Sequence, residues 1–363
     1  MPLDDDLAAW LRLSLIPRLG GDGLRRLLAA YGDPQRVLSA SRAELTRFVG
    51  DSAAAAIGQD PPDDALSAVN AWLDDPANRI VTLADAEYPR QFLQISDPPP
   101  LLYVKGRVEL LNRPTLAIVG SRNATAQGMA NAESFARTLS NAGLAVVSGL
   151  ALGIDAAAHR GGLAGASSSI AVVGTGLDIV YPARNRGLAY ELAEGGALVS
   201  EFALGTPALP ANFPRRNRLI SGLSLGCLVV EAAVGSGSLI TARSALDQGR
   251  EVFAVPGSIH SPLSKGCHAL IKQGAKLVES ARDILEELRL PGVIEPAADR
   301  VTATTLDEAS AGFLEEIGFE PVDPDTLAVR TGMNAAKISE LLTRLELDGA
   351  VAVLPGGKYQ RIR

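Results

Sequence analysis

The residues best suited to chemistry in this 363-residue chain are arginines that stand beside small or hydroxyl-bearing residues. Arg122 directly follows Gly120 and Ser121, and three further arginines lie within residues 215–218. Guanidinium groups, hydroxyls and the exposed backbone N–H groups of glycine-rich turns all bind phosphate oxygens. These residues therefore predict an anion-binding site, of the kind that a nucleotide or a nucleic acid would occupy.

The distribution of charge indicates that such a site must be local. The chain carries a formal net charge of -7, which excludes the broad cationic surface of a polybasic nucleic-acid-binding protein. Lys and Arg against Asp and Glu number 12 and 16 in residues 1–113, 15 and 13 in 114–290, and 7 and 12 in 291–363. Only the middle segment is net positive, and residues 202–230 within it contain no acid.

The same segment contains few candidates for catalysis, because general acid–base catalysis needs titratable groups that converge on one site. Asp155 and His159 have helical i, i+4 spacing and form the best pair, but we favour a structural role in which Asp155 caps a helix and His159 is hydrogen-bonded within the fold. Glu231 could be a base or a metal ligand, yet no second carboxylate accompanies it. We therefore predict no catalytic residue, no metal site and no enzymatic activity.

Six short apolar runs supply the elements that would position the arginines. They are LAIVG, LAVVSG, IAVVG, ALVSE, CLVVEA and VFAVPG, and helical spacers separate them. Runs without polar residues are typical of strands buried on both faces, and their alternation with helices predicts an α/β fold with a Rossmann-like, doubly wound, mostly parallel sheet. The carboxyl ends of such strands line the ligand crevice.

The turns after these runs favour phosphate over a dinucleotide cofactor. The first turn reads GSRNAT and the third reads GTGLD, so the GxGxxG fingerprint is absent and we expect no NAD or other cofactor. Ser236, Gly237, Ser238 and Thr241 would lie at a helix N-terminus, where hydroxyls and free N–H groups suit another phosphate. Plain N-capping explains the serines equally well.

The remaining sequence predicts two small domains and two linkers. Residues 1–60 have helical periodicity around a glycine-rich turn at 17–23, which resembles a helix-hairpin-helix (SAM-like) domain that either packs or contacts DNA. Residues 61–105 are rich in Pro and Asp and are expected to be a linker with an extended segment, irregular or an edge strand, packed on the core of 106–290.

The C-terminal part predicts a winged-helix domain. After a linker at 291–304, residues 305–363 contain three helices and a hairpin through Pro355, Gly356 and Gly357. The third helix carries enough acids to favour contact with a protein over insertion into a DNA groove.

The cysteines and the N-terminus predict a cytoplasmic protein. Cys227 and Cys267 can form neither a disulfide framework nor a zinc site by themselves, so we expect two reduced thiols. The N-terminal residues are acidic where a signal peptide is basic, and no apolar run reaches 18 residues.

Taken in order, the motifs resemble one family over about residues 90–290. IVGSR, SGLALGIDAAAH, VVGTGLDIVYPARN, FPRRNRLISGLS, VVEAAVGSGSLITARSALDQGREVFAVPGS and GCHALIKQGA are similar to those of the DprA/Smf family of DNA-processing proteins. The resemblance implies a Rossmann-like domain that binds and protects incoming single-stranded DNA without cutting it. It also implies homodimers, delivery of the strand to RecA in natural transformation, and single-stranded-DNA-binding protein as a further possible partner.

The resemblance also assigns residues. It places Ser121 and Arg122 in the family's phosphate-binding first loop and FPRRNR in its second DNA-contacting element, where Phe213 would either stack on an unpaired base or be buried over the sheet. His268 stands where the family usually has Asn, which puts that contact in doubt. The predicted DNA-binding residues are Gly120, Ser121, Arg122, Phe213, Arg215, Asn217, Arg218, Ser236, Gly237, Ser238, Thr241, Arg243 and Lys265.

A different class of function remains open, an enzyme that binds or hydrolyses a nucleotide in the same crevice. That alternative predicts a compact pocket with catalytic carboxylates beside the glycines, whereas FPRRNR supplies cations and an aromatic ring suited to a polymer.

Overall fold

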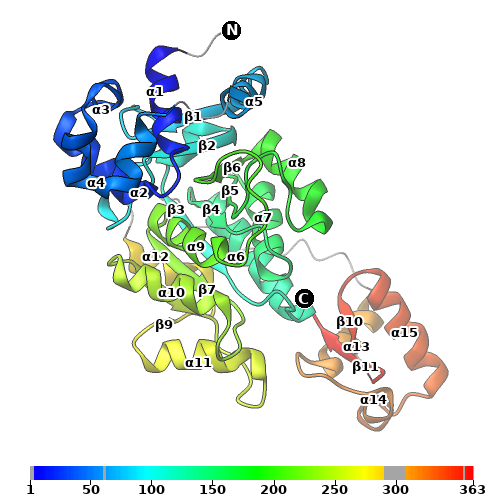
Figure 1. The fold of residues 1–363 in the computed structure, drawn as a ribbon. Helices are drawn as coiled ribbons and strands as arrows, with labels where there is room; N and C mark the ends of the chain where they lie inside the picture. Colours follow the sequence, from blue (N-terminus) through cyan, green and yellow to red (C-terminus); the bar gives the residue numbers. More distant parts are fainter. Residues whose placement is uncertain (1–3, 60–62, 290–306, 355, 363) are drawn as a thin grey trace.

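A nine-stranded sheet forms the centre of the molecule in the computed structural model, which describes residues 4–59, 63–289, 307–354 and 356–362 (Figure 1). The strand order is β1-β2-β6-β5-β4-β3-β7-β8-β9. The strands are β1 (Asn78–Thr82), β2 (Leu101–Gly106), β3 (Thr115–Val119), β4 (Ala145–Ser148), β5 (Ser169–Val172), β6 (Ala197–Ser200), β7 (Gly226–Val229), β8 (Glu251–Ala254) and β9 (Lys276–Leu277). From β6 to β9 all neighbours are parallel, and β1 and β2 are antiparallel additions beside β6.

The six predicted apolar runs form β3 to β8, so the prediction of a doubly wound, mostly parallel sheet is confirmed. Successive side chains of a strand point to opposite faces. In β3, Leu116 and Ile118 accordingly pack into one buried layer, while Ala117 and Val119 pack into the other. Each face is covered by helices, which is why the runs contain no polar residue.

Helices cover both faces of the sheet. The layer with Leu116 contains α6 (Ala126–Asn141), α7 (Ile154–Ala164) and α12 (Ala281–Leu288). The opposite layer contains α9 (Asn212–Leu223), α10 (Gly237–Asp247) and α11 (Lys265–Lys272), and α8 (Arg186–Gly195) packs beside α7. Four short 3₁₀ helices complete this part: η1 (Arg90–Gln94), η2 (Val108–Asn112), η3 (Ala183–Asn185) and η4 (Pro262–Ser264).

The strand order creates a crevice beside β3. From β3 the chain proceeds to β4 on one side, and it later returns through α9 to β7 on the other side. The loops that follow β3 and β7 therefore diverge, and a ligand crevice opens between them at the carboxyl ends of the strands.

The N-terminal residues form a helical unit that packs against the sheet domain. Its helices are α1 (Asp5–Ser14), α2 (Gly20–Tyr31), α3 (Pro34–Ser39) and α4 (Arg42–Ile57). The expected glycine-rich turn is shorter than predicted, since α2 already begins at Gly20. A Cβ on Gly21 would lie 3.3 Å from Cδ of Pro100, so this glycine allows α2 to approach the segment before β2 closely. This close approach is the packing that one of the two interpretations of the unit predicts.

Residues 61–105 differ from the linker and extended segment that we expected. They contain α5 (Asp63–Leu73), β1, η1 and most of β2, and β2 lies inside the sheet because β1 covers its outer edge. Val69 on α5 packs with Leu101 and Tyr103 of β2, and the Trp72 and Tyr103 rings meet edge to face at 5.8 Å. The apolar spacing of α5 outweighs the prolines before it, which are compatible with a helix start.

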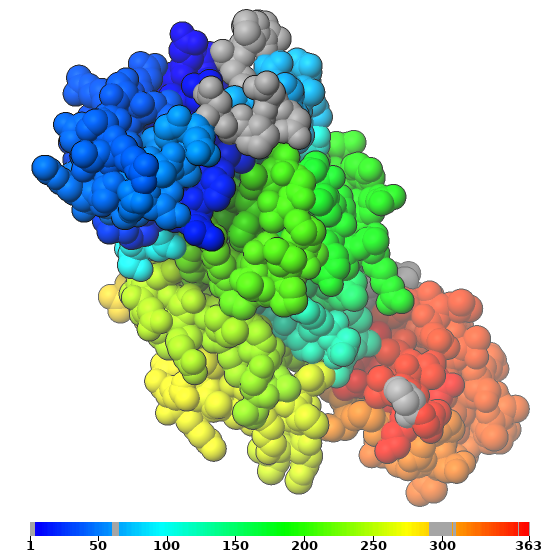
Figure 2. All heavy atoms as spheres, in the orientation of Figure 1, coloured from blue at the N-terminus to red at the C-terminus, as the bar shows by residue number. Residues whose placement is uncertain are grey.

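The C-terminal residues form the predicted winged helix. It consists of α13 (Glu308–Ile317), α14 (Pro324–Thr331), α15 (Ala335–Leu347) and the antiparallel pair β10 (Val351–Leu354) and β11 (Lys358–Arg361). This unit lies at the opposite end of the molecule from the N-terminal helices (Figure 2). The expected linker at 291–304 and Pro355 of the hairpin turn lie outside the described residues. Nowhere in the described ranges is a helix both long and apolar enough to cross a membrane.

Candidate nucleic-acid interface

A cleft of about 690 Å³ occupies the crevice predicted at the carboxyl ends of the strands. Its walls come from the loops after β3, β4, β5, β6 and β7, from the start of α7, from one face of α9 and from the first turns of α10. Most of the predicted site residues line it, namely Gly120, Ser121, Arg122, Phe213, Asn217, Ser236, Gly237, Ser238 and Thr241. The fold thus brings together three segments that are up to about 120 residues apart in the chain.

The loop after β3 is built for close packing beneath an exposed cation. A Cβ on Gly120 would lie 2.6 Å from Cγ1 of Ile154 and 2.9 Å from the carbonyl oxygen of Glu231, so only glycine fits there. The Ser121 hydroxyl accepts a hydrogen bond from the Asn123 N–H at 3.1 Å. Arg122 is exposed, and its guanidinium lies 5.7 Å from the centre of the Phe213 ring.

Phe213 lines the cleft and is half-buried. It is therefore neither fully buried over the sheet nor fully free to stack on a base, the two alternatives that the sequence left open. Its ring packs over Gly174 at the end of the β5 run, where an added Cβ would lie 3.1 Å from Cδ1. A second ring, that of Tyr181, lies 5.6 Å away between centroids. Phe213 therefore presents part of an aromatic surface to the cleft and anchors the rest on the sheet.

Arg216 is a cleft residue that our predicted site omitted. It is only 4% exposed, and its Nη1 donates to the carbonyl oxygen of Gly149 at 2.7 Å and to that of Val172. Its Nε donates to Oδ1 of Asn217 at 3.2 Å. Arg216 thus holds the ends of β4 and β5 and orients a neighbouring cleft side chain.

A signal for Arg216 was present in the sequence. Phe213, Arg216, Asn217 and Ile220 have i, i+3, i+4, i+7 spacing, which is one face of a helix, and all four line the cleft.

Asp155 faces Arg216 across Gly149. Its Oδ2 accepts hydrogen bonds from the N–H groups of Gly149 at 3.1 Å and Ala151 at 3.4 Å, so it binds the preceding loop rather than capping α7. A Cβ on Gly149 would lie 2.7 Å from this oxygen and 2.8 Å from both Nη atoms of Arg216. Burial raises the pKa of Asp155 and the guanidinium opposes this, while burial lowers the pKa of Arg216 to about 10 against the pull of the carboxylate.

His159 lies beneath the same loop and forms its hydrogen bonds with groups other than Asp155. Its Nε2 accepts a hydrogen bond from the Leu150 N–H at 3.2 Å, so the proton is on Nδ1, which donates to Oγ of Ser169 at 2.8 Å. Burial lowers the pKa of His159 to about 3, and the ring is neutral at physiological pH. Both members of the candidate catalytic pair are thus committed to internal hydrogen bonds.

Glu231 fastens the two sides of the crevice to each other. Its carboxylate accepts hydrogen bonds from the backbone N–H of Thr125 at 2.9 Å and from the Thr125 hydroxyl at 2.6 Å, at the start of α6. A Cβ on Gly128 would lie 2.4 Å from its Cδ. Among the residues that the structure describes, no group of three or more His, Cys, Asp or Glu side chains is arranged to hold a metal ion.

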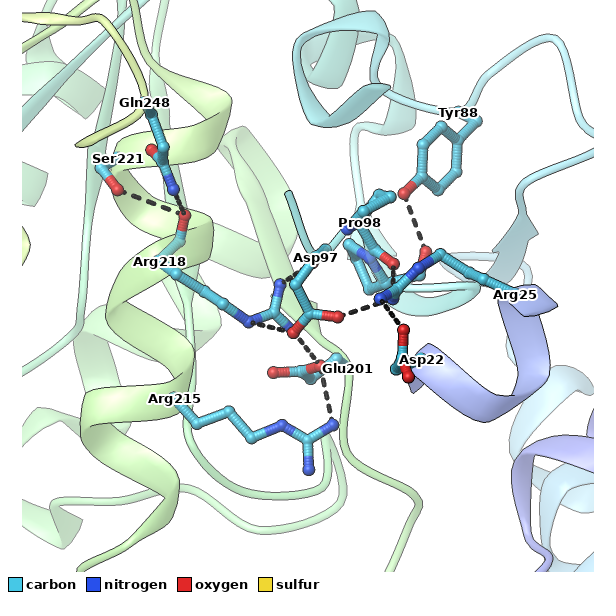
Figure 3. Close-up of polar contacts among 11 residues, drawn as sticks. Asp22, Arg25, Tyr88, Asp97, Pro98, Glu201, Arg215, Arg218, Ser221 and Gln248 are labelled. Atoms are coloured by element: carbon cyan, nitrogen blue, oxygen red, sulfur yellow. Dashed lines mark hydrogen bonds and ion pairs between the residues drawn. The ribbon is translucent and has the colours of Figure 1, made fainter. Parts of the chain in front are cut away.

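Arg215 and Arg218 lie outside the cleft lining, although we predicted them as DNA-binding residues. Figure 3 shows both pointing toward Glu201, whose side chain is 4% exposed at the end of β6. Arg215 reaches Oε2 of Glu201 at 3.1 Å, and Arg218 contacts both that oxygen and Oδ2 of Asp97, the latter at 3.2 Å. Residues 202–230 contain no acid, but the fold places Glu201 and Asp97 within ion-pair distance of their arginines.

The same network reaches the N-terminal helices. Arg25 on α2 pairs with Oδ1 of Asp97 at 2.6 Å and donates to the carbonyl oxygen of Pro98 at 2.7 Å. Asp97 therefore bridges α2 and α9, and one face of α9 serves the contact between the two units.

The last predicted residues are also outside the cleft lining. Arg243 is exposed on α10, and Lys265 is exposed at the start of α11. His268, one turn further along α11, shares a hydrogen bond of 3.0 Å between its Nε2 and the carbonyl oxygen of Gly257, which ties α11 to the loop after β8.

A doubly wound sheet with a polar crevice, joined to a winged helix, defines a Rossmann-like protein with a C-terminal winged-helix domain. The family model described as DNA recombination-mediator protein A matches residues 79–289, and that of the DprA winged helix domain matches residues 295–357. The chain therefore belongs to the DNA recombination-mediator protein A (DprA/Smf) family, and the resemblance drawn from the motifs is confirmed.

Relatives match most of the chain. Protein Smf of Escherichia coli is 41% identical over 99% of this chain and 96% of its own length, and DNA processing protein DprA of Streptococcus pneumoniae is 47% identical over 57% of this chain and 73% of its own. A crystal structure of the S. pneumoniae protein has a TM-score of 0.68 at 36% identity, and covers 79% of this chain and 99% of that one. A structure described as showing the single-stranded DNA binding mode of DNA processing protein A from Helicobacter pylori has a TM-score of 0.53 at 30% identity, over 58% and 96%.

Proposed function

We propose that this member of a family of DNA recombination mediators binds single-stranded DNA in the cleft beside β3. One observation carries the proposal: the cleft holds an exposed guanidinium at Arg122, an aromatic ring at Phe213 and the polar start of α10 along one groove. Cations that follow a backbone and rings that meet unpaired bases are the two parts of a single-strand site. The single-stranded DNA binding mode described for the H. pylori relative supports it.

The start of α10 supplies the second phosphate-binding group in this proposal. The hydroxyls of Ser236 and Ser238 lie 2.8 Å apart, and Ser236 caps the helix through the Ser238 N–H. With Gly237 between them, these residues place two hydroxyls and the first backbone N–H groups of α10 in the same cleft lining as Arg122.

The protein acts on DNA without cutting it in this proposal. Asp155 is the carboxylate among the cleft-lining residues, and it is buried and accepts hydrogen bonds from two backbone N–H groups. It therefore does not support the nucleotide-enzyme alternative, which predicts several catalytic carboxylates that converge on the cleft. A role as mediator is instead consistent with the family of the chain.

The partners follow from that role. We propose that the protein forms a homodimer through its Rossmann-like domain, protects the incoming strand, and transfers it to RecA during natural transformation, where it also meets single-stranded-DNA-binding protein. The unpaired, buried thiols of Cys227 and Cys267 are consistent with action in the cytoplasm. Sedimentation at micromolar concentration that shows only monomers would remove the homodimer from the proposal.

The test of DNA binding is a fluorescence-anisotropy titration with labelled single-stranded and duplex oligonucleotides at two salt concentrations. We expect tight binding to the single strand that weakens steeply with salt, and weaker binding to the duplex. An absence of binding to either oligonucleotide would overturn the proposed function. Stimulation of RecA filament formation on strands coated with single-stranded-DNA-binding protein would then test the mediator step.

A further inference from the structure

The cleft contains an exposed aromatic ring that the sequence analysis did not select. Tyr181 lies in the loop after β5, lines the cleft and is 48% exposed. Its ring is inclined by 41° to that of Phe213, with 5.6 Å between the centroids. The two side chains therefore form one aromatic surface.

Tyr181 is the more accessible half of that surface. The Phe213 ring packs on Gly174, and the guanidinium carbons of Arg122 and Arg216 lie 5.7 and 5.9 Å from its centre. These neighbours occupy much of the surroundings of Phe213 and hold it in place. A planar ligand that enters the cleft thus finds the exposed Tyr181 ring packed beside that of Phe213.

The position of Tyr181 gives the cleft two chemically different ends. The strands β5, β4, β3 and β7 are consecutive in the sheet, so the loops after β5 and β7 are separated by three strand spacings, roughly 14 Å. The β7 end carries Ser236 to Ser238 at the start of α10, and Arg122 lies after β3 in between. Phosphate-binding groups thus lie on one side and rings on the other.

We propose that Tyr181 is a base-stacking residue that contributes to the preference for single strands. The proposal rests on the proposed function and deepens it: one unpaired base lies on the Tyr181 ring while the adjoining phosphates reach Arg122 and the start of α10. Every base has a face that stacks on a ring, so this contact is independent of sequence. In a duplex the faces of the bases are covered by their neighbours, and the contact is lost.

The test compares two probes of equal length, oligo-dT and an abasic deoxyribose-phosphate strand, by anisotropy at several salt concentrations. Tyr181→Ala should bind oligo-dT about tenfold more weakly than the unmodified protein, the loss expected for one base–aromatic stack. Its affinity for the abasic strand and the salt dependence of oligo-dT binding should not change, because no cation is removed. Tyr181→Phe should retain full affinity.

Tyr190→Ala is the matched control, since Tyr190 is a tyrosine on α8 that is 60% exposed and lies outside the cleft lining. It should bind both probes like the unmodified protein. Unchanged oligo-dT binding by Tyr181→Ala would overturn the inference, and so would an equal loss for Tyr181→Phe, which would indicate a contact through the hydroxyl. If the unmodified protein binds no single strand, the proposed function itself fails, so the two failures are distinguishable.

Discussion

Both faces of helix α9 carry arginines, but the arginines of the two faces have different roles. Arg216, on one face, is buried under the cleft and holds the ends of two strands. Arg215 and Arg218, on the other face, pair with Glu201 and lead through Asp97 to the N-terminal helices. The helical period alone separates these arginines, which lie within four consecutive residues of the sequence. A cluster of cations in a sequence therefore does not define one site until the faces of its helix are assigned.

The faces also differ in what holds them together. The cleft face rests on groups withdrawn from solvent, namely Arg216, Asp155 and a neutral His159. The other face depends on ion pairs in which Arg215 and Asp97 remain about half exposed. Stability should therefore depend mainly on the cleft face of α9.

The largest effect is expected for Arg216→Met. This substitution removes the positive charge near the Asp155 carboxylate and the hydrogen-bond donor to the carbonyl oxygens of Gly149 and Val172. Removing one partner of such a buried charged arrangement costs about 3 to 5 kcal/mol of unfolding free energy. Urea denaturation monitored by circular dichroism measures this. Arg215→Met is the control on the opposite face and should cost less than about 1 kcal/mol. Equal losses for the two variants would contradict the assignment of the faces.

The neutral state of His159 predicts a specific pH dependence. Its folded-state pKa of about 3 lies below the unfolded value of 6.5, so the unfolded chain binds the proton first as pH falls. His159 therefore lowers the stability progressively between pH 6.5 and about 3, by about 2 kcal/mol at pH 5. Burial raises the pKa of Asp155, and this contributes stability as pH falls, opposite to His159, so a difference between two proteins is the proper readout.

That difference is obtained with His159→Gln, which removes the titrating ring and keeps an acceptor and a donor. Its unfolding free energy relative to the unmodified protein should rise by about 2 kcal/mol from pH 7.5 to pH 5. Parallel stability curves for the two proteins over this range would show that His159 is protonated in the fold, and would contradict the hydrogen bonds assigned to it.

The sequence was most informative where the determining pattern is local. We could predict the strands from the six apolar runs, the winged helix, and the loop of Gly120 to Arg122. In each case a short stretch of sequence contains the pattern, such as an apolar run for a strand buried on both faces and the small residues that directly follow it. Helix α5 and the position of β2 inside the sheet were missed, since prolines and acids nearby outweighed a weak apolar period. Asp97 and Glu201 could not be assigned as partners of α9, because 121 and 17 residues separate them from Arg218.

Tyr181 shows a different limit. A lone aromatic residue in a loop has no period, and its position beside Phe213 depends on the crossing from β5 to α9. Arg216, by contrast, could have been found from the helical spacing that it shares with Phe213 and Ile220.

Arg122→Ala tests the exposed cation of the cleft. It should weaken binding to oligo-dT by about 1 to 2 kcal/mol and reduce the slope of log affinity against log salt by about 0.7, the share of one phosphate contact on a single strand. Because Arg122 is exposed, the unfolding free energy should change by less than about 0.5 kcal/mol. Unchanged affinity and slope would remove Arg122 from the site.

The smallest effect is expected for Arg215→Ala, and it is the variant that could break the comparison. The sequence placed Arg215 beside Arg122 in one DNA site, whereas in the structure it lies over the Phe202 ring at 5.3 Å and pairs with Glu201. Such a half-exposed ion pair contributes at most about 1 kcal/mol, and Arg218 remains to balance the carboxylate. Affinity for oligo-dT and its salt slope, measured beside Arg122→Ala, should equal those of the unmodified protein. A drop in slope similar to that of Arg122→Ala would mean that Arg215 leaves Glu201 for a phosphate, so that both faces of α9 bind DNA.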